Sequence, residues 1–267
     1  MNMDIDQIRA RWYASLYEQQ ENQTDDVEFL LAFLGGAPLN ILEVCCGGGR
    51  ILVPLARAGH TAVGFDRDEA MLARIPAKAA GLANLRHYRA GALDSDWGQG
   101  FDAVILAGNI LINIETNGDY RQAQELFIRK AAAALKDGGL LYFDFNLFAH
   151  PERFFGSGKE STYFAGADEH GIRGRVISCS EGYDPLTQMA YSRGRIELDL
   201  PNGERDIRAT RSAKHIPTLE NIHGWLAAAG FAVREQYGDY ERNPIGETTN
   251  RAIIAACKNP GGAITIQ

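Results

Sequence analysis

The sequence predicts an α/β fold, in which an open, mainly parallel β-sheet carries helices on both faces and is interrupted by an antiparallel β insertion. Between residues 40 and 146, short apolar runs alternate with segments of helical period. Strands separated by helices of this length need right-handed crossovers, and these produce a parallel sheet covered on both sides. Across 147–216 the period changes to alternating polar and apolar residues, which is typical of antiparallel strands.

The elements of the parallel part follow from the apolar period and from local start and stop signals. Strands are expected at 40–45, 61–66, 85–91, 101–108 and 140–146. Helices are expected at 3–20, 25–36, 49–60, 67–81 and 119–135. Asp68 can cap the fourth of these helices. In the fifth helix, Ala123, Phe127, Ala131 and Leu135 recur at a spacing of four and form one apolar face.

The insertion is predicted to be an antiparallel meander of about three strands. Asp184-Pro185 and Asn202-Gly203 divide it, and Asn-Gly between alternating runs is a strong hairpin signal. A helix and two strands, "FAVREQYGDY" and "NRAIIAACK", follow the insertion. Because no helix joins these two strands, they should pair antiparallel. We therefore expect three parts, which are a helical segment at 1–36, a core at 37–146 and 217–258, and the insertion at 147–216.

Composition and charge narrow the class of protein. The chain has 267 residues, 45% of them hydrophobic, which suits one large domain or a core domain with an insertion. Its formal net charge of −7 argues against a general nucleic-acid binder, because such a protein presents a basic surface. No apolar run is long enough to span a bilayer, and the start lacks the layout of a signal peptide. A cytoplasmic location without membrane or nucleic-acid partners is therefore predicted.

The four cysteines do not predict a metal site. Cys45 and Cys46 are adjacent, while Cys179 and Cys257 stand alone, without C-x-x-C spacing or a nearby histidine cluster. A structural zinc site needs spaced ligands that converge on a tetrahedron. We interpret the adjacent pair as small buried loop residues rather than reactive thiols, and we expect no metal.

The stretch "NILEVCCGGGR" joins the first strand to a helix through three glycines. Glycine lets the backbone approach a ligand closely, and a helix N-terminus favours anionic groups. No lysine follows, so the loop is not a Walker motif, and Leu52 occupies the third glycine position of a dinucleotide fingerprint. Asp66 ends the second strand about twenty residues further on, where an acid can hold both ribose hydroxyls or, alternatively, cap a helix.

The residues "ILEVCCGGGRILVPLARAGHTAVGFDRDEAMLARI" resemble the first two motifs of the class I S-adenosylmethionine-dependent methyltransferases. Their loop has the form acid-x-Gly-x-Gly-x-Gly, met here by Glu43, Cys45, Gly47 and Gly49. The resemblance extends from about residue 40 to 258, because the later elements follow in the family order. It implies a Rossmann-like seven-stranded sheet whose last strand is antiparallel, with S-adenosylmethionine as cofactor. The insertion is similar to that of bacterial small-molecule methyltransferases of secondary metabolism.

The resemblance also implies roles for individual residues. Gly47 and Gly49 resemble the glycines under the methionine part of the cofactor, and Glu43 resembles the acid that orders this loop or meets the amino group. An N-terminal segment folds over the cofactor as a lid in such enzymes, with Tyr17 at a tyrosine that often contacts it; aromatic core packing is the alternative. The implied cofactor-binding residues are Tyr17, Glu43, Gly47, Gly49, Arg50, Asp66, Arg67, Ala92, Leu93, Asp94 and Ala107.

Two positions depart from the family pattern. Cys45 stands where the first glycine is expected, so the loop must accommodate a side chain where positive φ is disfavoured. After the third strand the family often has Gly-Asp, with the acid near the adenine amine, whereas here Ala92 follows Gly91. Backbone groups of Ala92 and Leu93, or the carboxylate of Asp94, could replace that contact.

The acceptor side offers no obvious base. Methyl transfer from a sulfonium is an in-line displacement, so alignment is the main catalytic contribution, on the order of 7–11 kcal/mol. Related small-molecule enzymes often have a histidine after the fourth strand, whereas this chain has Asn113, with Asn109 one turn earlier; both asparagines can instead cap a loop. Either His150, His215 or a tyrosine is the catalytic base, or none is needed. The lack of an obvious base slightly favours N-methylation over O-methylation, because an uncharged amine can attack first and lose its proton afterwards. A phenol acidic enough to be ionised is the alternative acceptor.

Two other functions stay open at this point. A nicotinamide-dependent oxidoreductase would need the third glycine and a parallel sixth strand, and both are missing or contradicted. A catalytically inactive cofactor-binding module agrees with the missing first glycine, but not with the intact Gly47, Gly49 and Asp66. The acceptor is expected to be a small molecule, since no nucleic-acid-binding motif or appended domain is present. Exposed strand edges in the insertion could form a homodimer contact.

Overall fold

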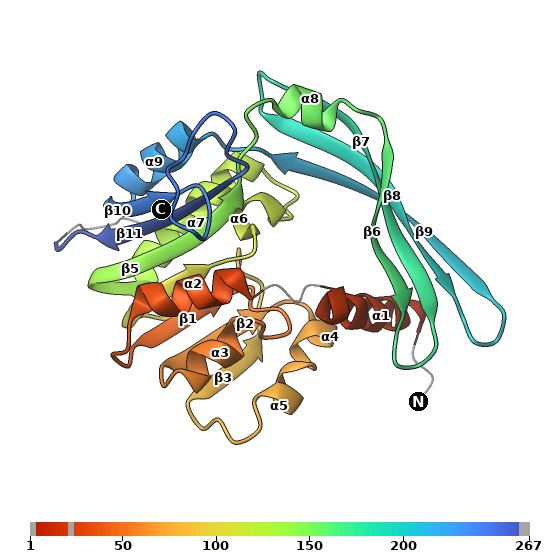
Figure 1. Cartoon of the computed structure of the whole chain (residues 1–267), viewed down its shortest axis with the longest axis horizontal. Helices are drawn as coiled ribbons and strands as arrows, with labels where there is room; N and C mark the ends of the chain where they lie inside the picture. The colour runs from red at the N-terminus through yellow and green to blue at the C-terminus, as the bar shows by residue number, and fades with distance from the viewer. Residues whose placement is uncertain (1–3, 21–23, 262–267) are drawn as a thin grey trace. The chain divides into compact units, whose positions relative to one another are not determined.

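The computed structural model describes residues 4–20 and 24–261, and these form two β-sheets with helices around them (Figure 1). The larger sheet has seven strands in the order β10-β11-β5-β4-β1-β2-β3. Its strands are β1 (Asn40–Val44), β2 (Thr61–Asp66), β3 (Leu85–Arg89), β4 (Phe101–Leu106), β5 (Leu135–Asn146), β10 (Phe231–Tyr237) and β11 (Arg251–Lys258).

The directions of these strands confirm the predicted mixed sheet. β1 pairs in parallel with β2 and β4, β2 with β3, and β4 with β5. β11 lies between β5 and β10 and is antiparallel to both. The last strand is therefore inserted antiparallel, and β10 and β11 pair as the missing helix between them predicted. This is the seven-stranded, Rossmann-like arrangement that the sequence resemblance implied.

Helices cover both faces of this sheet. They are α2 (Asp25–Leu34), α3 (Leu52–Arg57), α4 (Glu69–Leu72), α5 (Ile75–Lys78), α6 (Ile110–Asn113), α7 (Tyr120–Ala134) and α9 (Leu219–Ala228). Figure 1 shows α2 and α3 on one face and α7 and α9 on the other. α7 buries Ala123, Phe127 and Ala131 of the predicted stripe. Leu135, the fourth member, is instead the first residue of β5. Asp68 caps α4 by accepting hydrogen bonds from the backbone N–H groups of two residues of that helix.

Three local predictions were wrong. The single helix expected at 67–81 is two short helices, because Pro76 lacks an N–H and stands in the first turn of α5. The stretch Asp137-Gly138-Gly139 does not end a helix but lies within β5, which begins directly after α7. The helix expected at 49–60 is shorter, since α3 has 6 residues.

The smaller sheet is antiparallel, as predicted, in the order β6-β7-β8-β9. Its strands are β6 (Glu160–Ala167), β7 (Arg173–Asp184), β8 (Met189–Asp199) and β9 (Arg205–His215), and the short α8 (Pro151–Phe155) precedes them. The predicted turns at Asp184-Pro185 and Asn202-Gly203 separate the last three strands. About three strands were expected and four are present. β6 was not predicted, because a bulge between Thr162 and Phe164 interrupts its alternation of polar and apolar residues.

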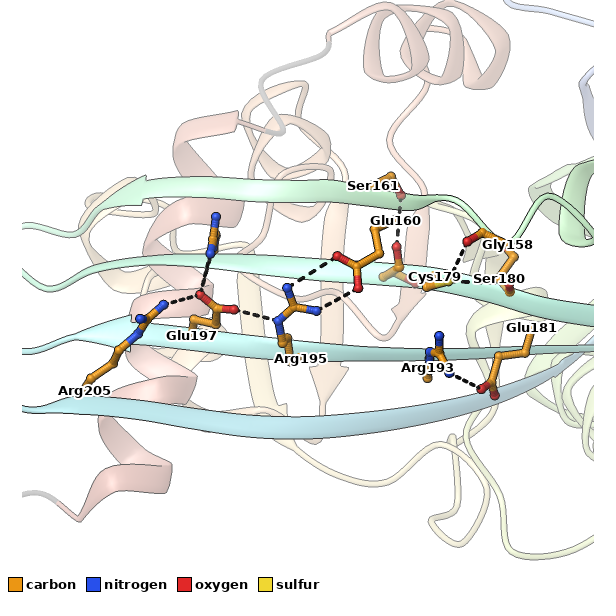
Figure 2. A network of polar contacts seen from close by, with 12 residues as sticks. Gly158, Glu160, Ser161, Cys179, Ser180, Glu181, Arg193, Arg195, Glu197 and Arg205 are labelled. Carbon is orange, nitrogen blue, oxygen red and sulfur yellow. Dashed lines mark hydrogen bonds and ion pairs between the residues drawn. The ribbon is translucent and has the colours of Figure 1, made fainter.

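One face of the smaller sheet is apolar and the other is charged. Trp12 and Leu16 of α1 (Ile5–Gln20) pack with Leu198 of β8 in a buried cluster. Successive residues of a strand point to opposite faces, so Glu197 lies on the other side. There its carboxylate accepts hydrogen bonds from Arg175, Arg195 and Arg205, at 2.9, 2.6 and 2.6 Å (Figure 2).

The chain divides into two compact units. α1 and His150–Ile216 form the first, and Thr24–Ala149 with residues 217–261 form the second. The helical segment expected at 1–36, parts of which (1–3 and 21–23) lie outside the described residues, is thus divided between them. The apolar side chains explain the division, because Trp12 packs in the cluster of the smaller sheet and Phe29 of α2 packs in that of the larger one. Among the described helices, none combines the length and apolar character that a membrane crossing requires.

Candidate functional site

Left-handed backbone angles shape the glycine loop between β1 and α3. Gly47 has a φ of +51° and Gly49 a φ of +76°, a region that favours glycine. A Cβ on Gly49 would lie 3.1 Å from Ile75 Cγ1, and one on Gly47 would lie 3.2 Å from Met71 Cε. Both predicted positions therefore need glycine, first for backbone conformation and also for close packing.

The position expected to hold the first glycine shows how a cysteine replaces it. Cys45 has a φ of +58°, which costs a non-glycine residue on the order of 1–3 kcal/mol. Burial raises the pKa of Cys45 to about 12, and it also raises the pKa of Cys46. Both thiols are free and protonated at neutral pH, which agrees with packing residues rather than reactive ones. Within the described residues, no three His, Cys, Asp or Glu side chains lie where they could hold a metal ion together.

Close contact between α3 and the sheet does not depend on a third glycine in the loop. Leu52 occupies that position, and a Cβ on Gly64 of β2 would lie only 2.7 Å from Leu52 Cδ2. The space that a dinucleotide-binding fingerprint creates in the loop is therefore created here in the neighbouring strand.

Asp66 connects the glycine loop to the end of β2. Its Oδ2 accepts a hydrogen bond from the N–H of Gly47 and its Oδ1 from the N–H of Asp68, both at 2.9 Å. A carboxylate can accept about four hydrogen bonds in all. Asp66 thus has a fixed orientation and still has acceptor positions for a ligand.

A cavity of about 260 Å³ lies at the carboxyl ends of β1 to β4. This edge of an open parallel sheet is where ligands commonly bind. The cavity brings together six residues predicted from the sequence, namely Asp66, Arg67, Ala92, Leu93, Asp94 and Asn113. Its other lining residues are Cys45, Ala90, Gly91, Ile110, Ile114, Glu115 and Phe127.

An ion pair lies among the residues that line this cavity. Nη2 of Arg67 donates to Oε2 of Glu115 at 2.5 Å, and both side chains are largely exposed. The hydrogen bond to Glu115 is the main reason why the pKa of Arg67 is raised. Sequence reasoning placed Arg67 here but missed Glu115, which follows α6 and carries no motif.

Glu43 is a buried acid with an incomplete set of partners. Its side chain lies on β1 and the residue is 5% exposed, yet Oε2 has no hydrogen-bond partner among the described residues. Burial raises the pKa of Glu43 to about 8, although the charge of Arg50 lowers it. Buried polar atoms are nearly always hydrogen-bonded, so this atom marks a place where a ligand donor would fit.

Arg50 has a partner that the sequence did not reveal. Its Nη1 and Nη2 donate to the two carboxylate oxygens of Asp26, each at 2.6 Å. Asp26 belongs to α2, so this paired contact joins the glycine loop to a helix that precedes β1. The cofactor-binding role that the resemblance implies for Arg50 stays a prediction.

The ends of β4 and β5 are held by a second buried acid, Asp144. Its Oδ1 accepts a hydrogen bond from the N–H of Gly108 at 2.8 Å. Its Oδ2 accepts from the hydroxyl of Tyr240 at 3.3 Å and from the guanidinium of Arg251. Burial raises the pKa of Asp144. The predicted site residue Ala107 precedes Gly108, so this network fixes the backbone beside it.

The two predicted asparagines face different surroundings. Asn113 lines the cavity. Asn109 has a φ of +64°, and its Oδ1 accepts a hydrogen bond from the N–H of Asn146 at 2.9 Å. Asn109 thus holds the end of β5, whereas Asn113 can reach a ligand in the cavity.

Tyr17, His150 and His215 belong to the first compact unit. The ring of Tyr17 lies 6.1 Å from that of Phe164, between centroids, and Tyr17 packs in the cluster under the smaller sheet. His150 is exposed and precedes α8, with Nδ1 3.5 Å from a carboxylate oxygen of Glu152. His215 is buried at the end of β9. Their predicted roles as lid residue and bases stay predictions.

Comparison with known proteins identifies the α/β part. Residues 41–139 match the model of a methyltransferase domain. The protein GWCH70_2453 of Geobacillus sp. (strain WCH70), whose name assigns it provisionally to the methyltransferases, is 26% identical over 82% of this chain and 84% of its own length. The ubiquinone biosynthesis O-methyltransferase of Chelativorans sp. (strain BNC1) is 36% identical, over 39% of each chain.

Solved structures share the fold over nearly the whole chain. The CcbJ methyltransferase from Streptomyces caelestis is similar with a TM-score of 0.71 and 20% identity, over 94% of this chain and 98% of that one. The sugar N-methyltransferase KedS8 from Streptoalloteichus sp ATCC 53650 is similar with a TM-score of 0.69 and 18% identity, over 92% of each chain.

The glycine loop and the acid at the end of β2 lie within the residues that match the methyltransferase domain. The antiparallel last strand belongs to the fold shared with the solved structures. The nicotinamide-dependent alternative is therefore wrong, because β11 is antiparallel and the matched family is a different one. The α/β part of the chain is therefore a class I S-adenosylmethionine-dependent methyltransferase domain, and its cofactor is S-adenosylmethionine.

Proposed function

We propose that this enzyme methylates a nitrogen atom of a small organic acceptor, with alignment of the two reactants as the main source of rate enhancement. The carrying observation is the side-chain chemistry at the carboxyl ends of the strands. Asn113 lines the cavity, at the position where the family resemblance implies a histidine. Asn109 accepts a hydrogen bond from the backbone N–H of Asn146 at the end of β5. Neither amide can accept a proton at neutral pH. An uncharged amine needs no base at the moment of attack, whereas a neutral hydroxyl does.

The extent of similarity to other enzymes also supports a nitrogen acceptor. KedS8, described as a sugar N-methyltransferase, is similar over 92% of this chain, and that span includes most of the antiparallel insertion. Similarity to the ubiquinone O-methyltransferase covers 39% of this chain. The insertion is the part in which acceptor recognition is expected, so the longer similarity is the more informative one.

Three features of the second unit fit the cofactor. Bound S-adenosylmethionine supplies an activated methyl group on a sulfonium. Glu43 is suited to the ammonium group, because its unpartnered Oε2 is buried beside the glycine loop. Asp66 is suited to the ribose hydroxyls, because its carboxylate is fixed and retains acceptor positions. Gly47 and Gly49 give the loop the left-handed backbone conformation with which we propose that it passes under the methionine part.

We propose further cofactor contacts around the adenine and the methionine end. Ala92, Leu93 and Asp94 line the cavity on the side where the adenine is expected, and Arg67 flanks it. Arg50 already donates two hydrogen bonds to Asp26, so we propose that it balances the charge near Glu43. Ala107 contributes backbone beside the methionine end.

Further predictions concern the first unit and the whole protein. Tyr17 as a lid residue, and His150 or His215 as a base, stay predictions that mutation would test. A homodimer through the exposed edge strands β6 and β9 stays a prediction for analytical ultracentrifugation. The cytoplasmic location predicted from the sequence is likewise left to direct localisation.

Calorimetric titration tests the cofactor assignment. We expect S-adenosylhomocysteine to bind the purified protein with micromolar affinity, and NAD and NADP not to bind. Binding of a nicotinamide dinucleotide in place of S-adenosylhomocysteine would overturn the assignment of the cavity.

A panel of amines and phenols, assayed with a labelled methyl donor, tests the acceptor. We expect label in amines, with a rate that follows the unprotonated fraction of the amine as the pH changes. Transfer to phenols alone, with a rate that follows a side chain of the enzyme, would contradict the nitrogen proposal.

A further inference from the structure

Lys130 on α7 holds the loop that follows β3 by an unusual set of contacts. Its Nζ donates to the backbone carbonyl oxygens of Ala92, Leu93 and Ser95 at 2.8, 2.7 and 2.7 Å. An ammonium has three donors, so all three are used on this one loop. Such charge-assisted hydrogen bonds are stronger than neutral ones.

Trp97 completes the attachment of this loop. Its ring is 2% exposed, and its centroid lies 5.6 Å from Nζ of Lys130, within the range of a cation–π contact. Its Nε1–H also donates to the carbonyl oxygen of Ala92, at 2.9 Å. The ring packs edge-on against Phe127, which lines the cavity. One side of the loop is therefore fixed by a cation and a buried indole.

The orientation of these carbonyls determines where the loop directs its N–H groups. In a trans peptide, the C=O of one residue points opposite to the N–H of the next. Because the carbonyls of Ala92 and Leu93 point to Lys130, the N–H groups of Leu93 and Asp94 point away from it. Both residues line the cavity, and neither N–H has a partner among the described residues.

We infer that Lys130 is a positioning residue for base recognition, which turns the N–H groups of Leu93 and Asp94 toward the acceptor nitrogens of adenine. This inference rests on the proposed placement of the adenosine part of the cofactor in the cavity. It explains how the chain recognises adenine although the Gly-Asp pair of the family is absent after β3. The backbone supplies donors, and a lysine distant in sequence gives that backbone its orientation.

The test compares two ligands that differ only in the base. S-adenosylhomocysteine has a ring nitrogen, N1, that accepts a hydrogen bond, whereas in S-inosylhomocysteine the same nitrogen carries a hydrogen. In the wild type we expect the adenine compound to bind about tenfold or more tightly, since a backbone N–H would face a second donor in the inosine compound. In Lys130→Met we expect this ratio to fall to about threefold or less.

The ratio separates positioning from general stability. If Lys130 had a purely structural role, Lys130→Met would lower the affinity for both ligands equally and leave the ratio unchanged. That result would overturn the inference. Lys136→Met is the matched control, because Lys136 donates to Asp102 outside the cavity, and this variant should keep the wild-type ratio.

A second variant covers the case in which Lys130→Met fails to fold. Trp97→Phe keeps an aromatic ring beside Lys130 but removes the donor to Ala92, so it should lower the ratio less and in the same direction. An unchanged ratio in Trp97→Phe, with Lys130→Met unfolded, would also count against the inference. Failure of the proposed function would look different, because the wild type itself would then not bind S-adenosylhomocysteine.

Discussion

Two glutamates, one in each sheet, have nearly the same small exposed fraction and opposite surroundings. Glu43 in the seven-stranded sheet is 5% exposed, and Glu197 in the four-stranded sheet is 6% exposed. Glu43 has an oxygen without a partner, and burial raises its pKa to about 8. Glu197 accepts hydrogen bonds from three arginines, of which Arg195 is the main cause of a pKa lowered to about 2 (Figure 2).

The difference separates a structural acid from the acid that we propose binds a ligand. Both carboxylate oxygens of Glu197 accept hydrogen bonds from arginines. Because these arginines lie on β7, β8 and β9, the network joins the three strands. Glu43 lies on the strand that leads into the glycine loop, and its Oε2 has no hydrogen-bond partner among the described residues. A buried acid whose partners are incomplete in the protein is therefore a better candidate for ligand binding than one that is fully paired.

The largest expected effect follows replacement of the acid at the end of β2. Asp66→Ala removes the acceptor proposed for the ribose hydroxyls and should weaken S-adenosylhomocysteine binding by about 1–3 kcal/mol. The change also frees the N–H of Gly47, so the thermal midpoint should be measured beside the affinity. Unchanged affinity in a folded Asp66→Ala protein would show that the cofactor lies elsewhere.

The next effect concerns Glu43 itself. Glu43→Gln keeps the size but removes the carboxyl group that can ionise to pair with the ammonium group of the ligand, and we expect about 1–2 kcal/mol weaker binding of S-adenosylhomocysteine with no loss of stability at pH 8. The matched variant is Glu197→Gln, which should lower the thermal midpoint and leave the affinity unchanged. Calorimetry and thermal unfolding of both variants measure this contrast, which would disappear if the two acids had the same role.

The two acids also predict opposite effects of pH on stability. The folded pKa of Glu43, about 8, is above its ordinary value of 4.5, so its contribution to the free energy of unfolding decreases as the pH rises from 4.5 to 8. The folded pKa of Glu197, about 2, is below 4.5, so its contribution is present above pH 4.5 and is lost as the pH falls toward 2. Urea unfolding at several pH values measures both trends, and Glu43→Gln should remove the first while leaving the second.

The smallest expected effect belongs to the exposed pair that lines the cavity. Arg67 and Glu115 are more than half exposed, and such pairs contribute about 0–1 kcal/mol to stability. Glu115→Gln should therefore leave the thermal midpoint within about 1–2 °C of the wild type. A large fall would mean that this pair has a structural role comparable to that of the Glu197 network.

Periodicity and motifs were sufficient to predict the strands of the seven-stranded sheet and the position of the glycine loop. The antiparallel pairing of β10 with β11 followed from a missing helix, and Asp66 followed from its distance to the loop. These features depend on residues close together in sequence, where alternation and spacing are visible. β6 was missed because its bulge disturbs the alternation on which the prediction depended.

The parts of the site that depend on distant residues could not be predicted. Nothing near Lys130 in sequence shows that it bonds to carbonyls of a loop 35 or more positions earlier. Asp26 is likewise an ordinary acid in the first turn of a helix until the fold brings Arg50 to it. In both cases the partner is defined by the packing of a helix on the sheet, for which a single sequence carries no local signal.

The most direct test of the comparison is calorimetric titration of S-adenosylhomocysteine into the wild type, Glu43→Gln and Glu197→Gln at pH 7. If the unpartnered Oε2 of Glu43 binds the cofactor, S-adenosylhomocysteine should bind the wild type and Glu197→Gln with micromolar affinity. It should bind Glu43→Gln about tenfold more weakly. Equal affinity in all three proteins would contradict the assignment of Glu43 to the cofactor. Weaker binding in Glu197→Gln alone would reverse the roles of the two acids.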